Sequence, residues 1–155
     1  MKQIMIKQQS LSYEMREELK TLRTNILFCG KDKKKIVVTS CFAGEGKSMI
    51  SLNLALSLAE LKKKVILIDA DVRRSVLAKV LDISEVKYGL THFLSGQCVL
   101  ENATLQTDFM NLDLIIAGPE VPNPTELLSS DNFRVMLERF EETYDYVIID
   151  SPPLG

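Results

Sequence analysis

The segment 44–48 combines small residues with a lysine and a serine, which together can bind phosphate groups. Small residues let backbone N–H groups converge on phosphate oxygens, and the amino end of a following helix adds partial positive charge. In such a loop the lysine reaches the β- and γ-phosphates, and the next hydroxyl coordinates magnesium. We therefore expect this segment to bind ATP or ADP together with Mg²⁺. The nucleotide-binding residues that we predict are Gly44, Glu45, Gly46, Lys47, Ser48 and Met49.

This loop departs from the full pattern of phosphate-binding loops at one position. The pattern has a glycine six residues before the lysine, and this chain has Cys41 there. An ordinary glycine-rich turn between a strand and a helix is therefore the alternative interpretation. The position of the loop, directly after a β-branched run and before a long apolar segment, favours phosphate binding.

Two carboxylates, Asp69 and Asp71, follow the apolar run 65–68. They leave the carboxyl end of a predicted strand, which is where ligands bind in open α/β sheets. Alternation along an extended chain points both side chains the same way. Such a pair can hold a hydrated Mg²⁺ and can also accept a proton. The alternative is a solvated turn at the end of the strand, which becomes less favourable beside a phosphate-binding loop.

A third acidic residue, Asp150, ends the apolar run 146–149. A carboxylate at this place can contact the metal through water, as in other phosphate-loop nucleotidases. The two prolines at 152 and 153 force the chain to leave the strand in an extended conformation. The alternative interpretation is a plain turn at the strand end.

Strand and helix patterns alternate along the chain and predict one α/β domain that covers residues 1–155. The predicted strands are apolar on both faces, which indicates a mainly parallel sheet covered by helices on both sides. This is the three-layer fold of P-loop NTPases. We predict strands at 36–40, 65–68, 112–116 and 146–149, and helices at 11–28, 47–61, 75–81, 90–94 and 131–142, with Thr125 as the cap of one more helix.

The composition is that of an ordinary globular domain, with 46% hydrophobic and 26% charged residues. A formal net charge of −2 gives the protein no general attraction to nucleic acid or to an acidic membrane. The three cysteines form no CxxC pair, so we expect neither a disulfide framework nor a zinc site, and a reducing cytoplasm fits best. No segment approaches the roughly 20 apolar residues of a membrane span. The one histidine, His92, is expected to be structural.

A larger set of segments accompanies the three motifs, and with it the chain resembles a known family. The set consists of Leu22-Arg23-Thr24-Asn25-Ile26, the phosphate-binding loop, Asp69-Ala70-Asp71 followed by Arg73-Arg74, Asn123-Pro124-Thr125-Glu126-Leu127-Leu128, and Tyr144-Asp145-Tyr146 leading to Asp150-Ser151-Pro152-Pro153. Over nearly its whole length the sequence is similar to the bacterial tyrosine kinases of capsular and exopolysaccharide synthesis. The resemblance implies an autophosphorylating protein-tyrosine kinase that uses ATP and Mg²⁺.

The resemblance also implies a role for each motif residue. Lys47 and Asp69 would be catalytic, because the family's lysine binds phosphate and its first aspartate is the base for the tyrosine hydroxyl. Ser48, Asp71 and Asp150 would hold the magnesium ion. Positioning and charge neutralisation would do most of the catalytic work, since phosphoryl transfer needs little covalent help.

The amino-terminal helix resembles the segment through which the family forms oligomers. The matching residues are Glu17, Lys20 and Arg23, where the family has Glu, Arg and Arg. Lys20 keeps the charge and loses the planar fork of arginine. The resemblance implies that residues 1–30 serve association with a second copy, with residues 31–155 as the nucleotide-binding core. A solvated helix face is the alternative interpretation of the first segment.

The family also suggests partners and a location. A transmembrane polysaccharide co-polymerase would activate the kinase, and a cognate tyrosine phosphatase would reverse it. The protein would be cytoplasmic and would reach the inner membrane face through its partner. No nucleic acid is expected among its ligands.

Family members continue for several elements beyond the third motif, so we expect this chain to lack their carboxy-terminal part. That part contains a strand beside the phosphate-loop strand and a tyrosine cluster, whereas this chain has only Tyr13, Tyr88, Tyr144 and Tyr146. Without that strand one edge of the sheet is exposed. Two alternatives therefore stay open. One is an ATPase switch of the partition or septum-placement type, although such proteins have a signature lysine where this chain has Phe42. The other is an inactive fragment that only binds nucleotide.

Overall fold

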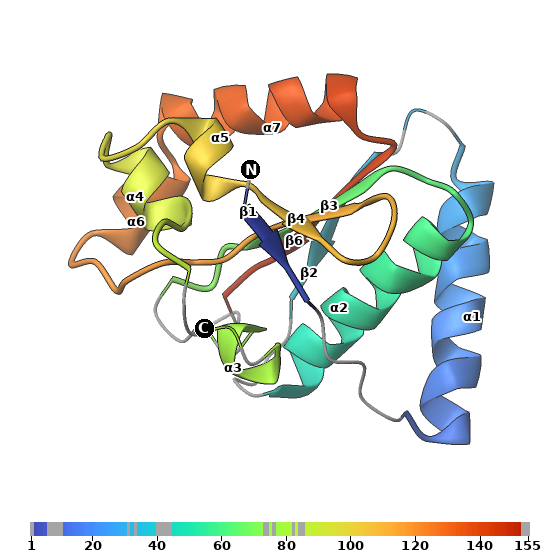
Figure 1. The fold of residues 1–155 in the computed structure, drawn as a ribbon. Coiled ribbons are helices and arrows are strands. Elements are labelled where there is room, and N and C mark those ends of the chain that lie inside the picture. Colours follow the sequence, from blue (N-terminus) through green and yellow to red (C-terminus); the bar gives the residue numbers. More distant parts are fainter. Residues whose placement is uncertain are drawn as a thin grey trace.

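A central sheet with helices on both sides makes up the computed structural model (Figure 1). The structure describes residues 2–5, 11–30, 32, 34–39, 45–72, 75, 77–81, 83 and 86–152. The strands are β1 (Lys2–Ile4), β2 (Lys35–Val38), β3 (Val65–Asp69), β4 (Leu105–Thr107), β5 (Leu112–Ile115) and β6 (Tyr146–Asp150). The helices are α1 (Tyr13–Phe28), α2 (Glu45–Glu60), α3 (Leu77–Val80), α4 (Leu90–Leu94), α5 (Leu100–Ala103), α6 (Pro124–Leu128) and α7 (Asp131–Thr143).

The strand order in the sheet is β1-β4-β5-β3-β6-β2. All pairs are parallel except β4 and β5, which run antiparallel. The prediction of a mainly parallel sheet between layers of helices is therefore confirmed. β2 lies at one end of this order, and its Val37 is 58% exposed.

Alternate residues of the central strands face two separate cores. On β3, Val65 and Leu67 pack into the core that contains α1 and α2, whereas Ile66 and Ile68 pack into the core that contains α4 and α7. Figure 1 shows α1 and α2 on one side of the sheet and α7 on the other. Because both faces of β3 and β6 are covered, all five residues of each strand are buried. This is why both strands read as continuous apolar runs in the sequence.

Each predicted helix and strand has a counterpart whose ends lie within two residues of the prediction. Three short elements were missed: β1, α5 and β4. Each has only three or four residues, too few for a hydrophobic period to be recognised. The predicted cap at Thr125 was wrong, because Asn123 occupies the N-cap position of α6 and Pro124 opens the helix. Proline suits this first position since its missing N–H would have no partner there.

Two features concern the surroundings of the protein. Within the part of the chain that the structure describes, no helix is both long and apolar enough to cross a bilayer. Cys29 and Cys98, the two cysteines within that portion, are free thiols. The third, Cys41, lies outside the described residues, as do Phe42 and Gly44.

The start of α4 lies unusually close to the end of β5. A Cβ atom added to Gly89 would stand 2.5 Å from the backbone nitrogen of Gly118 and 2.8 Å from the carbonyl oxygen of Ile116. The backbone of Gly89 is extended, with φ −134°, so any residue could adopt its conformation. Glycine is therefore required here for space and not for backbone freedom.

We predict that Gly89→Ala lowers the free energy of unfolding by about 3 kcal/mol, the upper end of the usual cost of overpacking, because backbone atoms must move to admit the methyl group. Chemical denaturation followed by circular dichroism measures this change. Gly96→Ala is the matched control, since nothing lies within 4 Å of its added Cβ and its φ is +80°. Its cost should be limited to about 1–2 kcal/mol of left-handed backbone strain. A Gly89→Ala protein as stable as its parent would contradict the close approach.

Candidate functional site

Three neighbouring parallel strands end together and bring the acidic motifs to one edge of the sheet. In the register of β3 and β6, Asp69 lies directly beside Asp150, and Val38 of β2 lies on the other side of Asp150. The backbone continues the pairing past the strand ends, since Ala70 N–H donates to the Asp150 carbonyl at 2.9 Å. The carboxylates predicted from separate motifs, 81 residues apart in the sequence, are therefore adjacent because the strands are parallel and in register.

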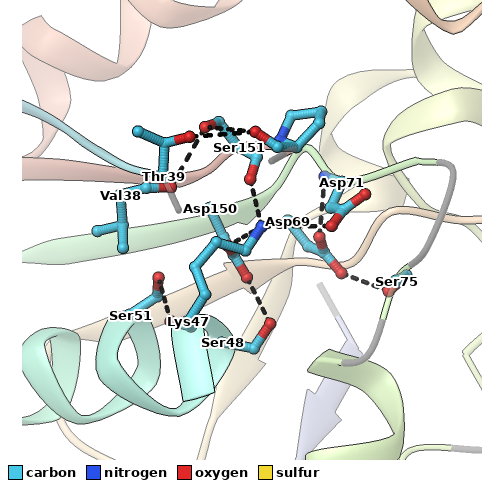
Figure 2. Close-up of polar contacts among 11 residues, drawn as sticks. Val38, Thr39, Lys47, Ser48, Ser51, Asp69, Asp71, Ser75, Asp150 and Ser151 are labelled. Atoms are coloured by element: carbon cyan, nitrogen blue, oxygen red, sulfur yellow. Dashed lines mark hydrogen bonds and ion pairs between the residues drawn. The ribbon is translucent and has the colours of Figure 1, made fainter. Parts of the chain in front are cut away.

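Lys47, in the first turns of α2, reaches into this row of carboxylates (Figure 2). Its Nζ lies 2.8 Å from Asp150 Oδ1 and 3.3 Å from Asp71 Oδ2, and it donates a hydrogen bond to the Ser151 carbonyl oxygen. Only 3% of the Lys47 side chain is exposed. The ammonium group is thus held at the end of β6 by partners from two strand ends.

The next residue, Ser48, contacts the same carboxylate from the other side. Its hydroxyl donates to Asp150 Oδ2 at 2.9 Å, so that the two oxygens of Asp150 face Ser48 and Lys47 respectively. One turn later, the Ser51 hydroxyl donates to the Lys47 carbonyl oxygen at 3.1 Å and stays within the helix. Consecutive residues at the start of α2 therefore both face the strand ends.

Asp69 has a different set of partners. Its Oδ1 accepts the backbone N–H of Asp71 at 3.1 Å, and its Oδ2 accepts the Ser75 hydroxyl at 2.5 Å. Burial, together with the negative charges of Asp150 and Asp71, raises the pKa of Asp69 from 3.8 to about 7, and the hydrogen bonds from Ser75 and the Asp71 N–H offset part of the increase. Asp69 can therefore take up and release a proton near neutral pH.

The whole cluster is withdrawn from water. Asp69, Asp71 and Asp150 are 1%, 5% and 0% exposed, and Lys47 is 6% exposed. Buried charges are tolerated only when they are paired or bind a cation. Among the described residues, the Lys47 ammonium pairs with Asp71 and Asp150, and Asp69 lies beside Asp150.

The donor atoms of the site suit magnesium. Ser48, Asp71 and Asp150 offer one hydroxyl and two carboxylates, all oxygen ligands. Among the residues with described positions, no group of three or more His, Cys, Asp and Glu side chains could hold a metal by itself. Mg²⁺ commonly binds proteins through one or two carboxylates and completes its shell with phosphate oxygens and water.

The structure brings together five of the predicted site residues: Lys47, Ser48, Asp69, Asp71 and Asp150. Of the remaining nucleotide-binding residues, Glu45 and Gly46 begin α2, Met49 is half-buried in the same helix, and Gly44 lies outside the described residues.

Two participants were missed by sequence reasoning. Ser75 was assigned to a weak helix, but its hydroxyl contacts Asp69, and the carbonyl oxygen of Ser151 accepts from Lys47. A serine shortly after an acidic strand end was the available signal for the first. The role of Ser151 could not be predicted from its residue type, because residues of every type have a backbone carbonyl.

The predicted oligomer-forming residues lie on α1, away from the site. Lys20 pairs with Glu17 of the same helix at 3.3 Å, and both side chains are well exposed. Arg23 donates to the Ser57 hydroxyl of α2 at 3.0 Å. Arg23 therefore already ties α1 to the nucleotide-binding core within one chain.

Comparison with known proteins places this geometry in a family. A family model described as an AAA domain matches residues 33–155. The tyrosine-protein kinase CpsD of Streptococcus agalactiae is 42% identical over 139 residues, which are 90% of this chain and 61% of CpsD. The chain thus spans about three fifths of the length of the curated relatives it matches first.

Solved structures agree in fold. The BceF tyrosine kinase domain has a TM-score of 0.79 and 42% identity, covering 88% of this chain and 55% of that one. The septum site-determining protein MinD of Pyrococcus horikoshii, solved in complex with Mg-ADP, has a TM-score of 0.67 and 26% identity, covering 79% of this chain and 50% of that one. The chain therefore belongs to the AAA-domain family, in the group of P-loop ATPase folds that contains the bacterial tyrosine-protein kinases.

Proposed function

We propose that this chain binds ATP with Mg²⁺ and transfers the γ-phosphoryl group to tyrosine side chains of proteins. The observation that carries the proposal is the meeting of Lys47 and Ser48 with Asp150 and Asp71, beside an Asp69 whose pKa is about 7. The similarity to CpsD and BceF, both named as tyrosine kinases, supports tyrosine as the acceptor.

In the proposed site the start of α2 binds the phosphates. Backbone N–H groups from Gly44 to Met49 would face phosphate oxygens, and Lys47 would exchange its carboxylate partners for the β- and γ-phosphates. Ser48, Asp71 and Asp150 would hold Mg²⁺, which supplies charge neutralisation at the phosphates. Because Lys47 already lies at the strand ends, little of its side-chain freedom remains to be lost on binding.

Asp69 is proposed as the general base. The tyrosine oxygen forms a bond to the γ-phosphorus while the bond from that phosphorus to the bridging oxygen breaks and ADP leaves. The hydroxyl proton passes to the Asp69 carboxylate. A base is most effective when its pKa lies near the working pH, and the burial of Asp69 brings it there.

The wider role rests on the family. We propose autophosphorylation and the control of capsular or exopolysaccharide synthesis and export, with a transmembrane co-polymerase as activator and a tyrosine phosphatase as the opposing enzyme. The protein would then be cytoplasmic and would lie at the inner membrane face through that partner. Residues 31–155 would form the catalytic core, and α1 with Glu17, Lys20 and Arg23 would support association between copies.

A second candidate is an ATPase switch, which the likeness to MinD favours. A switch would hydrolyse ATP and dimerise in response to nucleotide without phosphorylating tyrosine. The two functions share the phosphate-binding half of the site and differ in the acceptor, water or a phenol.

We predict that Lys47→Ala weakens the binding of Mg-ADP by about 10- to 100-fold, because a hydrogen bond to a charged group contributes about 1.5–3 kcal/mol. Isothermal titration calorimetry measures the affinity. Ser51→Ala is the matched control, since this serine lies on the same helix and bonds only within it. Unchanged affinity in a folded Lys47→Ala protein would refute the phosphate-binding role.

We predict that Asp69→Asn lowers the rate of phosphotyrosine formation by about 10²- to 10⁴-fold, the usual contribution of a general base. Mg-ADP affinity should change much less, because Asp69 does not contact Lys47 or Ser48. Labelled ATP and phosphotyrosine detection give the rate. Phosphate release without any phosphotyrosine in the parent protein would favour the switch instead.

The raised pKa of Asp69 also predicts a pH-dependent stability. Between pH 3.8 and about 7, the folded protein binds a proton at Asp69 that the unfolded chain has lost, so stability falls as the pH rises through this window and levels off above it. The substitution Asp69→Asn removes this loss of stability, because asparagine does not ionise. Since one unit of pKa shift corresponds to about 1.4 kcal/mol, the free energy of unfolding of Asp69→Asn should exceed that of the parent by about 4 kcal/mol at pH 8. The difference should vanish near pH 4. Urea unfolding in EDTA at several pH values measures it; a gain that does not grow with pH would contradict the shifted pKa.

A further inference from the structure

A pocket of about 380 Å³ opens beside Asp69, between α3, α4 and the chain just after β5. We call it the β5 pocket, because the chain just after β5 forms one wall. The wall opposite comes from α3, the segment before α4, and α4 itself. The lining of the pocket includes Ser75, Lys79, Lys87, Tyr88, His92 and Pro119.

The β5 pocket is one side chain away from the proposed base. Ser75 lines the pocket, and its hydroxyl lies 2.5 Å from Asp69 Oδ2. Figure 2 shows Ser75 on the far side of Asp69 from Lys47. A group that enters the pocket and reaches past Ser75 therefore meets Asp69 before it meets the lysine.

The strand order places Asp69 closer than Asp150 to the β5 pocket. The sheet runs β5-β3-β6-β2, and α2, which carries Lys47 near its start, packs across β3 and β6. Asp150 ends β6 and Asp69 ends β3, so Asp69 is the nearer of the two to the chain that leaves β5 and forms one wall of the pocket. An acceptor in this pocket would therefore approach from the side of Asp69.

The lining of the pocket suits an aromatic side chain on an acidic segment. Tyr88 and His92 form an edge-to-face pair with ring centroids 5.4 Å apart, and the Lys87 ammonium lies 5.2 Å from the centre of the Tyr88 ring. Among the described residues of the lining, the charged ones are Lys79 and Lys87, both exposed and both basic. The volume lies at the small end of the roughly 300–1,000 Å³ of ligand pockets, enough for one aromatic side chain with its flanks.

The walls are fixed by backbone contacts. Leu90 N–H donates to the Ile116 carbonyl at 2.7 Å, and Thr91 N–H donates to the Ala117 carbonyl at 3.0 Å. The Thr91 hydroxyl donates to the Pro119 carbonyl at 3.0 Å, and His92 Nδ1 accepts the N–H of Gly89 at 3.0 Å. His92 is thus structural, as expected, although it lines a pocket beside the site. Because these contacts already fix the wall, it can position an acceptor without first becoming ordered.

From this arrangement we infer that the β5 pocket receives the acceptor tyrosine of a protein segment rich in acidic residues, with Lys79 and Lys87 binding the flanking carboxylates. The inference rests on the proposed kinase function and adds the acceptor's chemistry. It makes Lys79 and Lys87 determinants of specificity, since they face the residues around the tyrosine and not the transferred phosphate.

The test compares two peptides, each with one central tyrosine, flanked on both sides either by glutamates or by lysines. Phosphotyrosine formation is measured for the parent chain and for the double variant Lys79→Glu with Lys87→Glu. The matched control is Lys62→Glu with Lys63→Glu, which makes the same change of charge in the turn between α2 and β3, at the opposite edge of the sheet. Calorimetry with Mg-ADP is run on every protein.

We expect the parent and the control to prefer the acidic peptide in kcat/KM by about tenfold, from two partly exposed ion pairs, and the pocket variant to reverse this preference. Transfer to both peptides without a charge preference, or a preference that Lys62→Glu with Lys63→Glu alters equally, would overturn the inference and leave the kinase function standing. Nucleotide binding with no transfer to either peptide would overturn the kinase function, and the acceptor pocket with it.

Discussion

The ion pair between Lys47 and Asp150 is the contact on which the site depends. Both groups are buried, and each is costly to remove from water unless the other is present. The pair joins the start of α2 to the end of β6 at 2.8 Å, so it couples the segment that we propose binds phosphate to the central strand of the site. Ser48 adds a second link to the same carboxylate. Because these contacts fix the start of α2, they would also fix where phosphate groups lie in the proposed nucleotide complex.

Parallel pairing makes this contact possible. Strands that run in the same direction place their carboxyl ends at one edge, and the register of β3 with β6 sets Asp69 beside Asp150. Two cores, one on each face, hold the strands in that register, since a slip by one residue would exchange the residues that face α2 with those that face α7. The packing of the apolar residues of β3 and β6 thus determines where the polar residues at the ends of these strands lie.

Much of this could be predicted from the sequence, and the reasons are specific. β3 and β6 are long apolar runs that end in aspartate, so both the strands and the carboxylates were visible. The strand order was not visible, because it depends on which helix crosses which face. β4, with three residues and an antiparallel partner, has no pattern of its own. Ser75 was missed for a related reason: its role depends on where its hydroxyl lies relative to Asp69, and residue types alone do not show that placement.

The environment divides the carboxylates into two kinds. Asp71 and Asp150 share the ammonium of Lys47, whereas Asp69 faces a hydroxyl and a backbone N–H and feels the negative charges of the other two. The raised pKa is that of Asp69, whose oxygens accept from Ser75 and from the Asp71 N–H. Carboxylates whose surroundings set them apart in this way can take different roles, one as a base and the others as ligands of a cation.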